Sequence, residues 1–159
     1  MDLRNWHRSC SAVALATVAL AVSCTYEIDL SKTVPGPPGT DESISTALWV
    51  YGYGNHVPQP SVYWYGPKAF DCTGFAYGQW GPGFLVDGEC LNGLTEGMEP
   101  RRIVVVYPPD GYISHSSLAH ELAHFVFGGH DHPVWIFGPD QSDEGMVGVA
   151  MRAIGNTGY

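Results

Sequence analysis

The segment of residues 119–132 constrains the fold of this chain more than any other. It reads Ala-His-Glu-Leu-Ala-His-Phe-Val-Phe-Gly-Gly-His-Asp-His. Positions four apart lie above one another on one face of an α-helix, so His120 and His124 would direct two imidazoles toward one point. Glu121 would lie about 100° around the helix from His120. A helix here therefore brings together two side chains that can bind a metal and one carboxylate.

The residues before and after these histidines predict a strand, a turn and a helix in that order. Residues 101–107 are rich in β-branched side chains, and residues 108–111 (Pro-Pro-Asp-Gly) are a strong turn signal. The polar residues 114–117 suit the start of a helix, and Gly128 and Gly129 suit its end. We therefore expect a helix over residues 117–127.

The pentapeptide of residues 120–124 resembles the His-Glu-x-x-His motif of the zincin metallopeptidases, and the resemblance covers residues 100–135. It implies a small α+β, loop-rich domain in which a twisted, mostly antiparallel sheet packs on the active-site helix. It also implies a Zn²⁺ cofactor and a peptide or protein substrate. His120 and His124 would be metal ligands, and Glu121 would be the general base that activates a water molecule.

The third metal ligand is expected among the residues that follow the glycine pair. His130 falls at the third-ligand spacing of the metzincins, a subgroup of the zincins, and is the expected ligand. His132 is the alternative if the turn is wide. Oxygen ligands from Asp131 or Glu144 also stay open.

The chain departs from the metzincin pattern at two positions. Phe127 stands where those proteins have glycine, and Met146 is the nearest counterpart of their methionine turn but lacks its flanking residues. These departures motivate a second hypothesis, a non-catalytic metal-binding or interaction lipoprotein on a degenerate zincin scaffold. Glu121 argues against it, because a site that only binds a metal does not need a base.

The N-terminus has the features of an export signal. Arg4 and Arg8 precede an apolar run over residues 12–22, which is too short to span a bilayer. Residues 20–24 (Leu-Ala-Val-Ser-Cys) resemble a bacterial lipoprotein box. The resemblance implies a signal peptide over residues 1–23 and a lipid on Cys24. We therefore expect a lipid-anchored protein of the bacterial cell envelope, facing the periplasm or the surface, or a secreted one if the box is not used.

The expected export also indicates how the remaining cysteines are used. Cys10 lies in the signal peptide and Cys24 would carry lipid, which leaves Cys72 and Cys90. Exported proteins commonly pair such cysteines, and neither residue has a Cys or His neighbour at metal-ligand spacing. We expect a Cys72–Cys90 disulfide.

The rest of the chain divides into a spacer and one domain. Proline and glycine are dense in residues 24–46, which predicts an extended tether, so the metallopeptidase domain is expected over residues 47–159. Aromatic and β-branched residues predict strands at 47–53 and 61–65. Short strands and turns are expected over residues 68–99, and a final helix over residues 146–154.

The composition fits a single folded domain. The hydrophobic fraction of 45% over 159 residues is sufficient for a packed core. The formal net charge is −9 with only 7 Lys and Arg residues, which argues against nucleic acid as a partner. The sequence makes no prediction of oligomeric state.

Overall fold

The computed structural model describes residues 26–54, 58–76, 79–96, 102–107, 115–129, 131–139 and 145–155. In chain order its elements are η1 (Leu30–Lys32), β1 (Thr33–Val34), α1 (Thr40–Val50), β2 (Ser61–Tyr65), η2 (Pro67–Ala69), β3 (Cys72–Ala76), β4 (Gln79–Val86), β5 (Glu89–Leu91), β6 (Gly93–Thr95), β7 (Arg102–Val106), α2 (His115–Phe127), α3 (Val134–Phe137) and α4 (Met146–Gly155). The mixture of helices with two mostly antiparallel sheets confirms the predicted α+β class.

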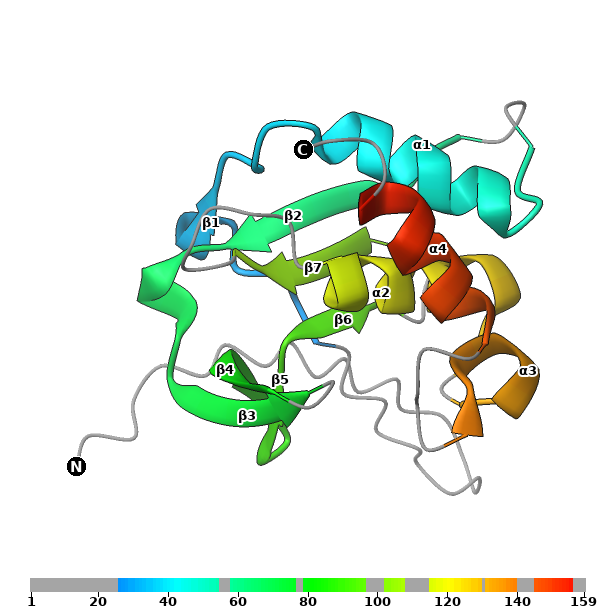
Figure 1. Cartoon of the computed structure of the whole chain (residues 1–159). Helices are drawn as coiled ribbons and strands as arrows, with labels where there is room; N and C mark the ends of the chain where they lie inside the picture. Colours follow the sequence, from blue (N-terminus) through cyan, green and yellow to red (C-terminus); the bar gives the residue numbers. More distant parts are fainter. Residues whose placement is uncertain are drawn as a thin grey trace, which may run out of the picture.

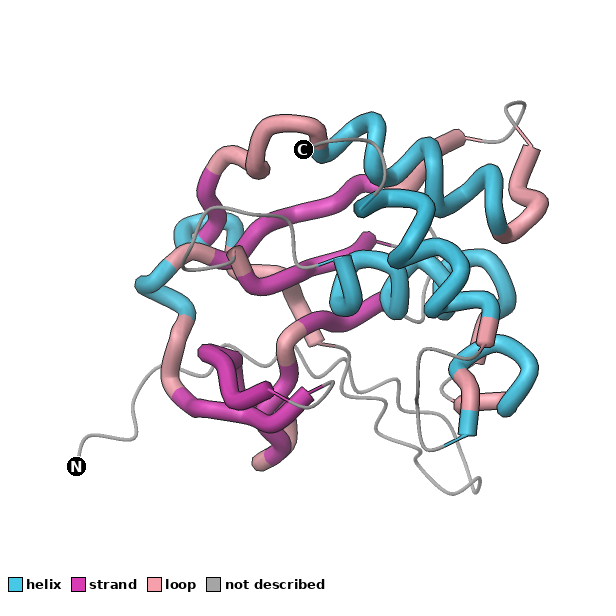
Figure 2. The backbone as a smooth tube through the Cα atoms, viewed as in Figure 1, coloured by secondary structure: helices cyan, strands magenta, loops and turns pink. Residues whose placement is uncertain are grey.

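The larger sheet has four strands in the order β1-β2-β7-β6. β1 pairs with β2 and β6 pairs with β7 in antiparallel fashion, whereas β2 and β7 are parallel. The smaller sheet, β3-β4-β5, is antiparallel throughout and lies beside the larger one (Figure 1). The helices α1, α2 and α4 gather on one side of the larger sheet (Figure 2). β6 is thus an edge strand of the sheet on which α2 packs.

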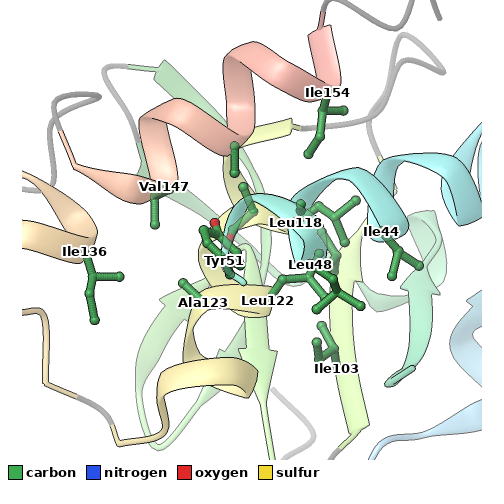
Figure 3. Packing of buried hydrophobic residues seen from close by; sticks show 14 of the residues in the cluster. Ile44, Leu48, Tyr51, Ile103, Leu118, Leu122, Ala123, Ile136, Val147 and Ile154 are labelled. Carbon is green, nitrogen blue, oxygen red and sulfur yellow. The ribbon is translucent and has the colours of Figure 1, made fainter. Parts of the chain in front are cut away.

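Strand β7 separates two hydrophobic cores. Successive side chains of a strand point to opposite faces, so Ile103 and Val105 face the helices while Val104 and Val106 face the other way. All four residues are buried, and Ile103, Val104 and Val105 have no exposed surface. The larger core, shown in Figure 3, joins β7 to residues of α1, α2 and α4 that include Ile44, Leu48, Leu118, Leu122, Val147 and Ile154.

The predicted strand at residues 47–53 is wrong, because most of this segment belongs to helix α1. Ile44, Ala47, Leu48 and Tyr51 recur at helical spacing and are buried against the larger core. The hydroxyl of Tyr51 donates a hydrogen bond to the backbone carbonyl of Ala119 in α2 (2.7 Å). The apolar residues that suggested a strand therefore form one face of a helix.

The structure also differs from the expected tether. Ile28 is only 3% exposed, and the hydroxyls of Tyr26 and Tyr65 share a hydrogen bond of 2.9 Å. β1 pairs with β2, and α1 begins at Thr40, so the boundary expected at residue 47 falls inside a helix. The segment folds onto the domain because its few apolar residues fill sites on β2 and the smaller sheet. The signal peptide expected over residues 1–23 and the expected lipid site Cys24 lie outside the described residues.

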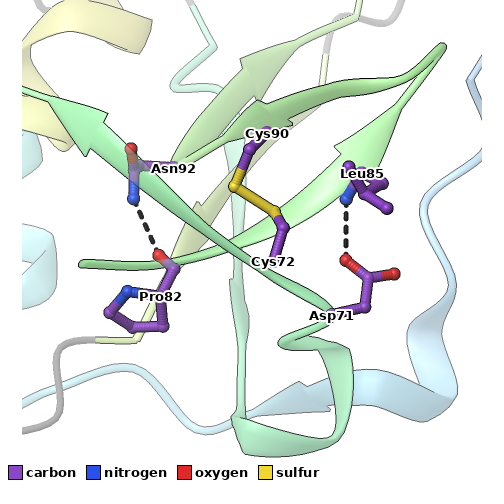
Figure 4. The surroundings of a disulfide bond; sticks show 6 residues. All are labelled: Asp71, Cys72, Pro82, Leu85, Cys90 and Asn92. Carbon is purple, nitrogen blue, oxygen red and sulfur yellow. Dashed lines mark hydrogen bonds between the residues drawn. A yellow bond between two sulfur atoms is a disulfide. The ribbon is translucent and has the colours of Figure 1, made fainter. Parts of the chain in front are cut away.

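The predicted disulfide between Cys72 and Cys90 is confirmed. It joins β3 to β5 across β4, and Figure 4 shows it between two further contacts. On one side the carboxylate of Asp71 accepts a hydrogen bond from the backbone of Leu85, and on the other the amide of Asn92 donates to the carbonyl of Pro82. Among the helices in the described part of the chain, none is long and apolar enough to cross a membrane.

Candidate metal centre

Helix α2 positions the site because its opposite side is fixed in the core. Leu118, Ala119, Leu122 and Ala123 have no exposed surface. They fix the rotation of the helix about its axis, so the direction of the remaining side chains is fixed as well. This confirms the helix predicted over residues 117–127, which begins two residues earlier, at His115.

The glycine pair ends α2 as predicted. Gly128 and Gly129 have φ angles of 72° and 76°, which favour glycine, and the N–H of Gly128 donates to the carbonyl of His124 (2.9 Å). The carbonyl of Gly129 lies 2.9 Å from Nδ1 of His124. The turn therefore stops the helix and also orients one of the predicted ligands.

Three histidines converge at the end of α2. Nε2 of His120 lies 3.1 Å from Nε2 of His124 and 3.1 Å from Nε2 of His132. One ligand atom from each residue lies within 4.8 Å of the others, so the three can bind one metal ion. His132 is exposed to solvent whereas His120 is 8% exposed, and the cluster is therefore reachable from outside.

The distances fit a tetrahedral ion of the size of zinc. With Zn–N bonds of 2.0–2.1 Å, two nitrogens of a tetrahedral site are about 3.3–3.4 Å apart, close to the observed 3.1 Å. A proton on Nδ1 of His124, donated to Gly129, leaves the Nε2 lone pair for a metal. Without a cation, a proton on Nε2 of His120 can be donated to Nε2 of only one neighbour at a time, either His124 or His132. One cation can bind the nitrogens of all three histidines.

Burial keeps His120 in the form that a metal requires. Its pKa falls from 6.5 to about 3, first because burial disfavours the charged ring and then because His124 and His132 lie close by. A neutral imidazole at pH 7 can donate its lone pair without first losing a proton.

The third nitrogen of this cluster comes from His132, which was the alternative ligand in the sequence. His130, the expected ligand, lies outside the described residues, as does Glu144, so their roles stay predictions. Asp131 is exposed and does not belong to the cluster. Among the described residues, His132 therefore completes the set.

The aromatic ring of Phe137 contacts the rings of all three histidines. The centroid of its ring lies 4.7 Å from that of His120, 4.9 Å from His124 and 4.7 Å from His132. Phe137 is 3% exposed and belongs to the larger core. Met146, the residue that the sequence suggested for this neighbourhood, starts α4 and packs against the same core.

Glu121, the predicted base, is buried against β6. Its Oε2 is 2.9 Å from the hydroxyl of Thr95, whose oxygen is also 2.8 Å from the backbone carbonyl of Glu121. The carboxylate is so close to Gly93 that a Cβ there would lie 2.9 Å from Oε1. Burial raises the pKa of Glu121 from 4.5 to about 7, although the hydrogen bonds from Thr95 lower it in part.

No family model, no curated protein and no solved structure matches this chain. What the centre can do therefore follows from its own groups. Three imidazoles form a cluster that could hold a metal ion, and the position after His120 in α2 carries a carboxyl group with a pKa near neutrality. This combination is suited to activating a water molecule.

The sequence did not indicate Phe137, Thr95 or Gly93. Phe137 follows His132 by five positions and could have been suspected only as an apolar residue beside a ligand. Thr95 and Gly93 lie on a three-residue strand with no motif of their own. Their importance arises from the packing of β6 on α2, which no local pattern encodes.

Proposed function

We propose that this protein is a zinc-dependent peptidase with His120, His124 and His132 as metal ligands and Glu121 as general base. The observation that carries the proposal is that three imidazole nitrogens lie close together and that the residue after the first of these histidines is the buried Glu121. As the resemblance of residues 20–24 to a lipoprotein box implies, we further propose that the protein is exported and anchored through lipid on Cys24. Metabolic labelling with palmitate tests the anchor, and an unlabelled, freely soluble mature protein would rule it out.

Glu121 carries the proton through the reaction. A bound zinc ion would supply a Lewis acid that lowers the pKa of water and polarises the scissile carbonyl. The carboxylate of Glu121 takes a proton from the attacking water as the new C–O bond forms. It then gives that proton to the leaving nitrogen as the C–N bond breaks. A pKa of about 7 suits both steps, because the group can release the proton as readily as it takes it.

Edge strand β6 provides backbone groups for an extended substrate. The carbonyl of Asn92 accepts from the N–H of Val106, and the N–H of Glu96 donates to the carbonyl of Arg102. Backbone groups alternate in direction along a strand, so those of Gly93 and Thr95 point away from β7, to the side of β6 on which no described strand pairs. A peptide added there as a further strand would lie beside Glu121.

The test compares wild type with Glu121→Gln after loading both with zinc. We expect one zinc per chain in both proteins and chelator-sensitive cleavage of a peptide library by wild type alone. Loss of a general base should lower kcat by about 10²- to 10⁴-fold. Glu89→Gln, at an exposed position of β5, is the matched control and should cleave like wild type. Equal cleavage by Glu121→Gln would contradict the mechanism, and zinc without any cleavage by wild type would favour the non-catalytic metal-binding alternative.

A further inference from the structure

Both carboxylate oxygens of Glu121 lie against the same short strand, β6. Oε2 is 2.9 Å from the hydroxyl of Thr95, and Oε1 occupies the space that a side chain at position 93 would fill. A Cβ on Gly93 would lie 2.6 Å from Cγ of Glu121 and 3.1 Å from its carboxyl carbon. Strand β6 therefore fixes where this carboxyl group lies and how it is rotated.

We propose that Thr95 and Gly93 are the positioning residues of the general base, Thr95 by orienting the carboxyl group and Gly93 by leaving it room. The inference rests on the proposed function, because Glu121 must be the base for its orientation to matter. Neither residue needs to contact the substrate or the metal through its side chain. Both act through Glu121.

The hydroxyl of Thr95 can form a hydrogen bond with the Glu121 carboxyl group whether Glu121 is ionised or protonated. A hydroxyl has one proton to donate and two lone pairs to accept with, and here it lies near two oxygens of Glu121, Oε2 and the backbone carbonyl. It donates to Oε2 while the carboxylate is ionised. Once Glu121 has taken a proton from water, the carboxyl group can donate to the threonine oxygen while the threonine proton turns to the carbonyl. No buried polar group loses its partner in either state, so the carboxyl group can keep its place through the cycle.

Strand β6 also determines where Glu121 lies relative to a bound peptide. The side chain of Thr95 and the Cβ position of Gly93 face α2, while the backbone groups of the same two residues point away from β7, to the side of β6 where no described strand pairs. The backbone of Thr95 there also interacts with the carboxyl group of Glu121. A peptide paired with β6 would therefore lie beside a carboxyl group that these residues hold. Changing the side chain of Thr95 should alter the base without altering the backbone groups that bind substrate.

The first arm of the test is kinetic and uses zinc-loaded variants of the whole protein. Thr95→Val removes the hydroxyl at nearly constant volume, and kcat should fall about 10- to 100-fold with unchanged KM and zinc content. Thr95→Ser restores the hydroxyl and should recover most of the lost kcat. Thr33→Val, which removes a hydroxyl that bonds only locally to Leu30, is the matched control and should keep the kcat of wild type.

Gly93→Ala tests whether the Glu121 carboxyl group needs the room that glycine leaves at position 93. The new methyl group should displace the end of the Glu121 side chain and lower kcat, again with zinc retained. The control is Gly81→Ala in β4, where the nearest atom to a new Cβ is 3.9 Å away and kcat should not change.

The second arm does not depend on activity. With ¹³C-labelled glutamate, the carboxyl signal that disappears in Glu121→Gln is that of Glu121. Thr95→Val and Gly93→Ala should shift this signal, and the two control variants should not. A role confined to stability would lower the free energy of unfolding and leave the signal of the folded protein unchanged.

Each outcome decides between the alternatives. A Thr95→Val enzyme with the kcat of wild type, or an unshifted Glu121 signal in both site variants, overturns the inference. If Thr95→Val does not fold, Gly93→Ala and Thr95→Ser decide through the same two readouts. If zinc-loaded wild type cleaves no peptide, the proposed function fails, and the carboxyl signal alone then decides whether β6 positions Glu121.

Discussion

Phe137 connects the candidate metal centre to the hydrophobic core. Its ring contacts the imidazoles of His120, His124 and His132, and almost all of its own surface is buried. Two of these histidines come from α2, whereas His132 comes from the segment after it. A rigid aromatic side chain beneath all three limits how their rings can tilt, and so helps to hold the three nitrogens at metal-binding distance.

We expect Phe137→Ala to weaken both the fold and the metal site. Removing a buried phenyl ring should lower the free energy of unfolding by about 3–5 kcal/mol. Loss of a group that orients ligands should weaken zinc binding by about 10- to 100-fold. Chelator competition measures the affinity, and the visible absorption spectrum of the Co²⁺ form reports the ligand geometry. Phe127→Ala is the control, since it removes a partly buried phenylalanine that the described contacts place against Tyr51 and Trp135. An unchanged affinity and spectrum in Phe137→Ala would show that the ring only fills space.

The sequence revealed the part of the site that lies on α2, and it named His132 as the alternative third ligand. His120, Glu121 and His124 could be identified because one helix determines their spacing. The identity of the third ligand depends on the path of the chain after Gly128 and Gly129. Glycines with positive φ angles allow that chain to leave the helix in several directions. For this reason the spacing alone could not separate His130 from His132.

The disulfide between β3 and β5 is the element-scale feature with the clearest energetic consequence. It closes a loop with a sequence separation of 18 residues, and β5 leads through Asn92 directly into β6. Cys72→Ser with Cys90→Ser should lower the free energy of unfolding by about 3 kcal/mol on the chain-entropy model. Urea unfolding measures this difference. The fully reduced wild-type protein should match the double variant, and a double variant as stable as oxidised wild type would contradict the expectation.

Secondary structure followed from sequence where one periodicity dominated. The aromatic residues of β2, the β-branched run of β7, and the apolar spacing of α2 and α4 gave the correct elements. Helix α1 was mistaken for a strand because Trp49, Val50 and Tyr51 favour strands individually. The spacing of Ile44, Ala47, Leu48 and Tyr51 and the acidic residues of its first turn were the signals for a helix. The parallel pairing of β2 with β7 could not be read locally, because the three strands of the smaller sheet and β6 lie between them in the chain.

For the whole molecule, the buried ionisable groups of the centre make stability depend on pH. The pKa of Glu121 is about 7 in the folded protein and 4.5 ordinarily, so between these values the folded state binds more protons. Stability from this group is therefore greatest below pH 4.5 and falls as pH rises to 7. His120 acts oppositely. Its folded pKa of about 3 lies below 6.5, so the unfolded state binds more protons in that range and stability rises with pH.

We expect Glu121→Gln to become stabilising relative to wild type as pH rises, in the absence of metal. The difference in the free energy of unfolding between the two proteins should grow by about 3 kcal/mol from pH 4.5 to above pH 7. Urea unfolding with a chelator present, at several pH values across this range, measures it. Comparing the two proteins at each pH cancels the contribution of His120. A difference that is the same at every pH would show that Glu121 is not buried as described.

Anomalous diffraction at the zinc edge from zinc-loaded crystals would show whether His120, His124 and His132 together bind one zinc ion. We expect one peak per chain, about 2.0–2.1 Å from Nε2 of each of the three histidines. The absence of a peak at this cluster, or a peak whose third protein ligand is His130 instead of His132, would show that these three histidines are not the ligands of a zinc ion.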